Sequence, residues 1–318
     1  MTVLVVAGGS LGAGAGTAFA YSWPITPFFQ PHPITSFFGD PRTIYDEYYA
    51  GGAALNGPGR FSFHNGVDIP APEGTPVYPV VSGRAHLLSG TAVVVRASRR
   101  RVFQYYHVLP IVTNGEWVYA RRTVIGYVLG WAKHVHLAEI DRGHVTNPLL
   151  PGHLAPYADT TKPVVSSLVF RNATGQELDP LALHGAVDIV ASAYDTPPLA
   201  LPGVAVPLPV APAALSWSLT TPDGRAAISL RTTVDFRVTL PFNRDFWLVY
   251  ARGTYQNNPT FGGHPRRLRG RYLYHLEPSL FDTALVPNGA YVLTVTATDE
   301  RGNTGTLVMP VAVVNDLP

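Results

Sequence analysis

The sequence predicts a mainly β protein with two domains, and three observations support this. A length of 318 residues is a prior for two domains, each large enough to bury its own core. The chain holds 30 glycines and 30 prolines, whereas charged residues make up only 14% of it, and this mixture favours short strands joined by turns over long solvated helices. Short runs rich in β-branched and aromatic residues occur in both halves.

The first predicted domain spans residues 21–150. Its strand-like runs are separated by turn-forming residues and show no sustained helical period. The runs are GTPVYPVVSGRAHLL, TAVVVRAS, RVFQYYHVL and HVHLAEI. We therefore expect a domain built from strands.

The second predicted domain spans residues 164–318. It follows a linker at 151–163, where prolines and small polar residues interrupt both the helical and the strand-like periodicity of apolar residues. Its alternating runs have the spacing of an antiparallel sandwich. They are VVSSLVF, AVDIVASAY, ALSWSLT, TVDFRVTL, FWLVYA, RYLYHL, AYVLTVTATD and GTLVMPVAVV. This half resembles the immunoglobulin-like or fibronectin-like modules appended to secreted enzymes, which implies an immunoglobulin-like β-sandwich with an accessory role.

Residues 1–20 are apolar and rich in small side chains, and they end in Ala18-Phe19-Ala20. This pattern is typical of a secretory signal with an A-x-A cleavage site, so we expect a secreted protein whose mature chain begins near Tyr21. An uncleaved membrane anchor is the alternative. No other segment is long and apolar enough to span a membrane, so no stable span is expected after cleavage.

The composition restricts the chemistry available to the chain. The absence of cysteine excludes a disulfide scaffold, a thiolate zinc site and a cysteine nucleophile. A formal net charge of +2 does not indicate nucleic acid as a partner. Any transition metal must therefore be held by histidine, aspartate or glutamate.

Two histidines lie two residues apart in His134-Val135-His136. On a strand, side chains at this spacing project from the same face, about 7 Å apart. Imidazole is both the commonest side-chain metal ligand and a good proton carrier near neutral pH, so one of these histidines could bind metal while the other moves protons. Taken alone, the pair also fits polar residues on a half-exposed strand.

A second motif lies upstream, where His64 and Asp68 have an H-x-x-x-D spacing. A hydrolytic zinc site needs about three protein ligands and one open position, and His64, Asp68 and one histidine of the H-x-H pair meet that requirement. The other histidine of the pair, together with His107 in QYYHVLP, is then available for proton transfer. For His64 and Asp68 alone, an aspartate-capped turn bonded to a nearby histidine is an equally good interpretation.

Four sequence blocks lie between residues 33 and 150, namely ITSFFGDPR, FHNGVDIPAPEGTPVYPVVSGRA, YYHVLP and VIGYVLGWAKHVHLAEI. They resemble the lysostaphin-type zinc endopeptidases, which cut peptidoglycan cross-bridges, and they occur in the order found in that family. The resemblance implies an antiparallel β-sheet metallopeptidase domain in which His64, Asp68 and His136 are the zinc ligands and His107 and His134 are the catalytic histidines.

The sequence departs from this family in two places. The loop before H-x-H is the short GYVLGWAKHVH rather than a stretch rich in glycine, serine and threonine, and Val108 follows His107 where leucine is usual. Both changes lie where the resemblance places the wall of the substrate groove. They therefore affect the expected substrate preference and leave the predicted zinc ligands and catalytic histidines unchanged.

The resemblance implies a secreted, cell-wall-associated zinc endopeptidase that acts on peptidoglycan peptide stems or cross-bridges. Two alternatives stay open. One is a non-catalytic wall-binding or amidase-activating protein that uses the same groove, and the other is a structural adhesin led by the sandwich.

Several other acidic residues can be assigned simpler roles. No HExxH helix accompanies Glu73 or Glu139, and Glu139 is expected on the face of its strand opposite His134 and His136. Four aspartates of the second half are scattered and lack a calcium-loop motif, so turn and strand-end roles are predicted for them. They are Asp159, Asp188, Asp195 and Asp299.

Overall fold

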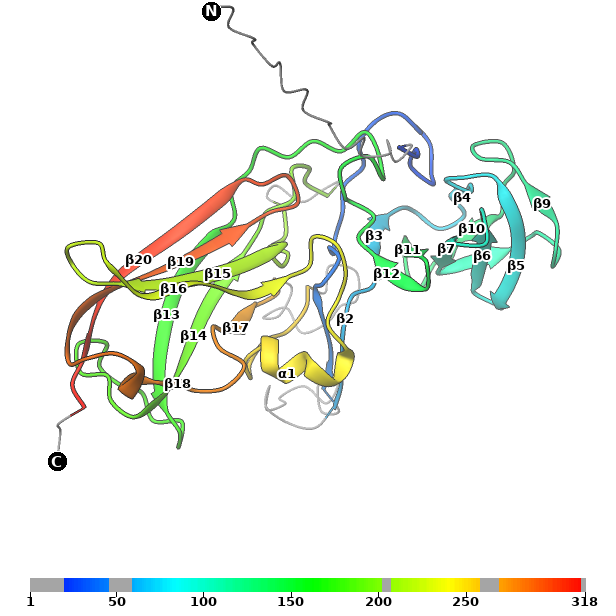
Figure 1. Cartoon of the computed structure of the whole chain (residues 1–318). Coiled ribbons are helices and arrows are strands. Elements are labelled where there is room, and N and C mark those ends of the chain that lie inside the picture. Colours follow the sequence, from blue (N-terminus) through cyan, green and yellow to red (C-terminus); the bar gives the residue numbers. More distant parts are fainter. Residues whose placement is uncertain (1–19, 46–58, 202–206, 258–268, 316–318) are drawn as a thin grey trace, which may run out of the picture.

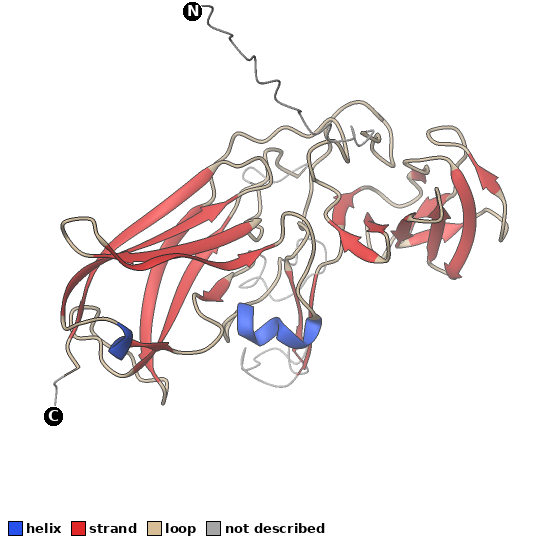
Figure 2. Cartoon of the chain, in the orientation of Figure 1, coloured by secondary structure: helices blue, strands red, loops and turns tan. Residues whose placement is uncertain are grey.

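The computed structural model describes residues 20–45, 59–201, 207–257 and 269–315. Almost all regular structure in these ranges is β-strand, which confirms the predicted mainly β fold class (Figure 2). Residues 1–19 of the expected signal segment lie outside the described ranges. Within the described part of the chain, no helix combines the length and the apolar character needed to cross a membrane.

The first half contains strands β1 to β12 in three antiparallel sheets. The largest has the order β12-β11-β7-β6-β5-β9, with β3 also paired to β11; a second has the order β4-β10-β8, and β1 pairs with β2. The bounds are β1 (Pro41–Tyr45), β2 (Gly59–Phe63), β3 (Val67–Pro70), β4 (Pro76–Val77), β5 (Gly83–Ser89), β6 (Ala92–Arg96), β7 (Arg101–Tyr106), β8 (Val108–Pro110), β9 (Trp117–Val118), β10 (Gly126–Val128), β11 (His134–Asp141) and β12 (His144–Thr146).

The alternation of side chains along β11 orients the histidines. Val135 and Leu137 are completely buried and belong to the core of the first half, together with Phe103 and Tyr105 of the neighbouring β7. Because successive strand residues point to opposite faces, His134 and His136 project from the other side of the sheet. Burial of the valine and leucine therefore fixes the face on which the imidazoles lie.

The second half contains two antiparallel sheets. One has the order β13-β14-β17, with β18 also paired to β14, and the other has the order β16-β15-β19-β20. Their shared core includes Trp217 of β15, Ile189 of β14 and Val295 of β19, as expected for a sandwich. The bounds are β13 (Val164–Asn172), β14 (Ala186–Tyr194), β15 (Ala214–Thr220), β16 (Ala226–Asp235), β17 (Leu273–His275), β18 (Phe281–Asp282), β19 (Gly289–Thr298) and β20 (Thr304–Val313). The immunoglobulin-like assignment of this sandwich stays a prediction.

One expected strand is wrong. The run FWLVYA contains the short helix α1 (Phe246–Val249), which follows the 3-10 turn η2 (Asn243–Asp245). Phe246, Val249 and Tyr250 are buried, whereas Leu248 between them is 47% exposed. This burial has the three-to-four-residue spacing of a helix, which a short, uniformly apolar run cannot reveal in the sequence.

The two halves contact each other directly, and β2 lies beside α1 between the two groups of strands (Figure 1). Phe38 and Phe63 of the first half belong to the sandwich core. The Tyr250 hydroxyl donates a 2.7 Å hydrogen bond to the carbonyl oxygen of Gly39, and the amide of Phe63 donates a 3.0 Å bond to Asn243 Oδ1. The connection at residues 151–163 contains no helix or strand, and the proposed domain boundaries stay a prediction.

Candidate metal centre

His64, Asp68 and His136 come from three neighbouring backbone segments. His64 follows the end of β2, while β3 and β11 pair so that Asp68 lies directly opposite His136. Gly66 lies between His64 and Asp68 in the sequence, and its Cα packs closely against β11. A Cβ atom there would lie 2.3 Å from the carbonyl oxygen of Leu137 and 2.9 Å from the His136 ring, so the motif requires glycine at this position.

One donor atom from each of these three side chains meets the other two. His64 Nε2 lies 3.1 Å from Asp68 Oδ1 and 2.8 Å from His136 Nδ1, and the Asp68 and His136 atoms are 3.0 Å apart. Ligand atoms around a tetrahedral zinc ion are about 3.3 Å apart, and the three observed separations lie within about 0.5 Å of that value. All three residues are buried.

The protonation of His64 supports a metal ligand. Its Nδ1 lies 2.8 Å from the carbonyl oxygen of Phe37, which can only accept, so Nδ1 carries the proton and Nε2 presents a lone pair. Burial, followed by the nearby Arg42 guanidinium, lowers the pKa of His64 to about 3 and keeps the ring neutral at pH 7. A lone pair that faces a carboxylate oxygen and a second imidazole fits a bound cation, and two imidazoles with one carboxylate form a donor set suited to zinc.

Arg42 orients the carboxylate of Asp68. Its Nη2 atom lies 2.5 Å from Asp68 Oδ2, and its Nη1 atom donates a 2.7 Å hydrogen bond to Ser36 Oγ. Burial alone would raise the pKa of Asp68, but His64 and Arg42 hold that pKa well below its usual value. Asp68 Oδ1 is thereby left for the metal. Sequence reasoning missed this role, although Arg42 closes the ITSFFGDPR block.

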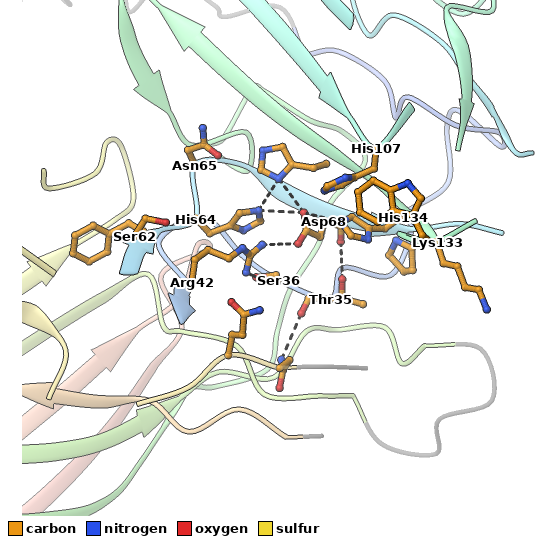
Figure 3. A pocket seen from close by; sticks show the side chains of 16 residues that line it. Thr35, Ser36, Arg42, Ser62, His64, Asn65, Asp68, His107, Lys133 and His134 are labelled. Atoms are coloured by element: carbon orange, nitrogen blue, oxygen red, sulfur yellow. Dashed lines mark hydrogen bonds and ion pairs between the residues drawn. The ribbon is translucent and has the colours of Figure 1, made fainter. Parts of the chain in front are cut away.

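His134 and His107 lie beside the three donors, so the structure brings together all five predicted site residues (Figure 3). His134 Nδ1 lies 2.8 Å from the carbonyl oxygen of Ala132, to which it can only donate, and Nε2 lies 3.6 Å from Asp68 Oδ1. The His107 and His134 ring centroids are 4.6 Å apart, in an edge-to-face arrangement. The division of the five residues into metal ligands and catalytic histidines stays a prediction.

His107 has an unusual backbone. Its φ angle is +65°, in the left-handed region that side chains other than glycine seldom adopt, and it forms the corner between β7 and β8. The amide of Leu129 donates a 2.9 Å hydrogen bond to the His107 carbonyl oxygen and so holds this corner. Burial, followed by His134, lowers the pKa of His107 to about 4, so its ring is neutral at pH 7.

These residues line a hollow of about 300 Å³ whose opposite wall comes from the second half of the chain. Gln256 and Asn257 form part of that wall. Two hydrogen bonds of 3.1 Å hold Gln256. The backbone amide of Thr43 donates to Gln256 Oε1, and the backbone amide of Gln256 donates to Thr43 Oγ1. Trp131 lines the hollow as well and is 55% exposed, with its ring 4.9 Å from that of His107. No motif in the sequence marks Gln256 or Asn257.

Glu139 does not belong to the hollow, in agreement with its expected position on the other face of β11. It is fully buried and accepts a 2.6 Å hydrogen bond from the Tyr21 hydroxyl. Its carboxylate also lies 2.7 Å from Arg101 Nε and 2.8 Å from His153 Nδ1. These partners give Glu139 a structural role between the N-terminal segment and the sheet.

No protein-family model matches the sequence, and no curated protein is detectably similar to it. Several solved structures resemble part of the chain, among them the following three. A zinc-containing peptidase from Vibrio cholerae is 22% identical over 40% of this chain and 39% of its own, with a TM-score of 0.32. The catalytic domain of the prophage-encoded M23 protein EnpA from Enterococcus faecalis, in a mutant form, is 25% identical over 41% of this chain and 95% of its own, with a TM-score of 0.29.

The third structure, Csd3 from Helicobacter pylori, is 19% identical over 44% of this chain and 34% of its own, with a TM-score of 0.31. The matched region therefore spans less than half of the Vibrio cholerae and Helicobacter pylori proteins. Because all three TM-scores are below 0.5, we base the functional proposal on the side chains of the site.

Proposed function

We propose that this protein is a secreted zinc-dependent endopeptidase that hydrolyses peptide cross-links of bacterial peptidoglycan. One observation carries the proposal: three donor atoms lie 2.8 to 3.1 Å apart, beside two further imidazoles in one open hollow. A buried group of this kind has the ligands for a metal and leaves separate groups for moving protons. The wall substrate and the secretion follow from the motif resemblance and from the signal-like segment.

His64, Asp68 and His136 would hold the zinc ion. When bound, zinc polarises the carbonyl of the scissile amide and lowers the pKa of a bound water into the neutral range. Arg42 keeps the Asp68 carboxylate ionised and oriented, so this positioning residue acts through Asp68 rather than on the substrate.

His134 is the better placed of the two remaining histidines to accept a proton from the attacking water. Its Nδ1 donates to the carbonyl oxygen of Ala132, so Nε2 is the ring atom directed at the site and the one that would act as the base. His107, neutral at pH 7, can donate a hydrogen bond to the oxyanion that develops on the carbonyl. The side-chain NH2 group of Gln256, across the hollow, suits the carbonyl oxygens of a peptide main chain, whereas the side-chain amide of Asn257 is bonded within the protein, to Pro209 and Gly270.

The test uses the purified full-length protein, a His134→Ala variant and a His184→Ala control, since His184 is exposed in the second half. We expect near-stoichiometric zinc by mass spectrometry in all three proteins. We expect wild type and His184→Ala to release muropeptides from purified wall, and His134→Ala to release them about a hundredfold to ten-thousandfold more slowly.

Two results would overturn the proposal. Protein without zinc that leaves the wall intact would favour the non-catalytic wall-binding alternative. Unchanged hydrolysis by His134→Ala would place the chemistry elsewhere in the protein. Mass spectrometry of the released fragments also identifies which bond is cut.

A further inference from the structure

Three aspartates far apart in the sequence meet at one end of the sandwich. Asp159 lies in the connection before β13, Asp195 directly follows β14, and Asp299 directly follows β19. Each supplies a carboxylate oxygen within 4.8 Å of those of the other two. Their exposed fractions are 6%, 1% and 0%, so three acidic groups are packed together almost without solvent. The sequence predicted separate turn and strand-end roles for them.

The described residues provide no cation that balances this aspartate cluster. None of the three carboxylates forms an ion pair with a described arginine, lysine or histidine. The nearby Arg301 donates instead to backbone carbonyl oxygens, those of Leu149 and Tyr157. Buried charges without a partner are costly, so the cluster requires either protons or a bound cation.

The hydrogen bonds of the cluster distinguish one carboxylate from the other two. Asp299 Oδ1 accepts from the amides of Arg301 and Asn303, and Asp159 Oδ1 accepts from Thr161. Asp195 Oδ1 accepts from the Thr196 amide, whereas its buried Oδ2 has no hydrogen-bond partner among the described residues. Burial, reinforced by the neighbouring carboxylates, raises the pKa of Asp195 to about 8, so without a cation this carboxyl group holds a proton at pH 7.

We propose that Asp159, Asp195 and Asp299 bind a calcium ion. The cluster offers oxygen atoms only, which suit a hard cation rather than zinc. Three convergent carboxylates favour Ca²⁺ over Mg²⁺, which retains several waters and is usually bound through one or two carboxylates. The unpartnered Asp195 Oδ2 supplies a ligand atom that the protein itself leaves unused.

A calcium ion at this position would fasten the connection between the two halves. Asp159 belongs to residues 151–163, whereas Asp195 and Asp299 belong to the ends of sandwich strands in opposite sheets. The ion would therefore join the connecting segment to both sheets at once. This site is separate from the histidine centre, and its existence does not depend on the proposed peptidase activity.

The experiment follows thermal unfolding of the full chain after dialysis against EGTA, with and without CaCl₂ or MgCl₂. The test variant is Asp195→Asn, which removes the charge but keeps the side-chain shape. The matched control is Asp223→Asn, because Asp223 is exposed in the turn between β15 and β16. Calorimetric titration with CaCl₂ measures the stoichiometry.

We expect CaCl₂ to raise the unfolding temperature of wild type and Asp223→Asn by several degrees, as about 2.7 kcal/mol would at a hundredfold excess over Kd. Titration should give one calcium per chain. Asp195→Asn should lose the calcium response yet unfold no earlier than wild type in EGTA at pH 7, because asparagine has the shape of the protonated, neutral carboxyl group that it replaces.

Three results would overturn the assignment. The first is an unfolding temperature of wild type that calcium leaves unchanged. The second is a calcium response that Asp195→Asn retains in full. The third is a shift with MgCl₂ equal to that with CaCl₂, which would rule out a calcium-selective site.

Discussion

The histidine centre and the aspartate cluster differ in how the negative charge of their buried carboxylates is balanced. In the histidine centre, Arg42 contacts one oxygen of Asp68 and leaves the other beside two imidazoles. In the aspartate cluster, Asp195 has a buried oxygen without any partner. The pKa of Asp68 is accordingly held well below its usual value, whereas that of Asp195 is raised to about 8. His64 and the Arg42 guanidinium favour the ionised form of Asp68 before any metal binds, whereas Asp195 must be neutralised by a proton or by an ion from solution.

The largest effect that sharpens this contrast is expected from His136→Ala. Removing one of three ligands should abolish zinc binding and lower wall hydrolysis by about a thousandfold or more. Zinc content and muropeptide release measure both effects. The calcium response should survive, because the aspartate cluster shares no residue with the histidine centre. If zinc content stayed at one per chain, His136 would not be a ligand.

Arg42→Gln makes Asp68 resemble Asp195 by removing its internal counter-charge. We expect zinc affinity to fall about tenfold to a hundredfold, the usual cost of losing a group that orients a metal ligand. Competition with a chromophoric chelator measures this affinity. Arg96→Gln, at an exposed strand end, is the matched control and should bind zinc like wild type. Equal affinity in both variants would show that Arg42 does not position Asp68.

The histidine centre also differs from the aspartate cluster because it faces a hollow lined by both halves of the chain. Gln256→Ala tests the function of that hollow. Losing one hydrogen bond to substrate should raise KM about fivefold with little change in kcat, since about 1 kcal/mol is removed. Steady-state kinetics on a defined wall peptide measure both constants. Gln176→Ala, in an exposed turn, is the control. Loss of kcat alone would contradict a binding role.

The smallest expected effect is a pH dependence of the metal-free protein. The pKa of His107 is about 4 in the folded chain and 6.5 in the unfolded chain, so only the unfolded chain gains this proton between those pH values. Folding stability should therefore decrease as pH falls from 6.5 towards 4. Urea unfolding of chelated wild type and His107→Gln at several pH values measures the difference. An equal pH dependence in both proteins would mean that His107 contributes nothing.

Much of the first half could be predicted because its signals are local. The alternation in His134-Val135-His136 predicts which side chains share a face, and burial of Val135 confirms the face. The other predicted site residues lie in motifs that follow the order of the resembled family, and the structure brings these residues together. The role of Arg42 was hidden because one arginine after a turn does not show which carboxylate it will meet.

The second half was harder to predict for two physical reasons. A short apolar run such as FWLVYA satisfies a buried helix and a buried strand equally well, and packing of Phe246 and Tyr250 against the first half decides between them. Residues that only the tertiary structure brings together form no motif of fixed spacing in the sequence, so their proximity could not be predicted. Gln256 and the aspartate cluster are both of this kind.

The contact at Gly39 limits how this protein can be re-engineered. Gly39 has a φ angle of +91°, and a Cβ atom there would lie 2.4 Å from the ring of Phe236. Phe38 next to it and Phe63 are already embedded among sandwich side chains. A chimera that joins residues 21–150 to a foreign module would leave these aromatic rings bare, with an aggregation-prone patch close to the histidine centre. Recombination at the apparent linker is thus a poor way to retarget this protein.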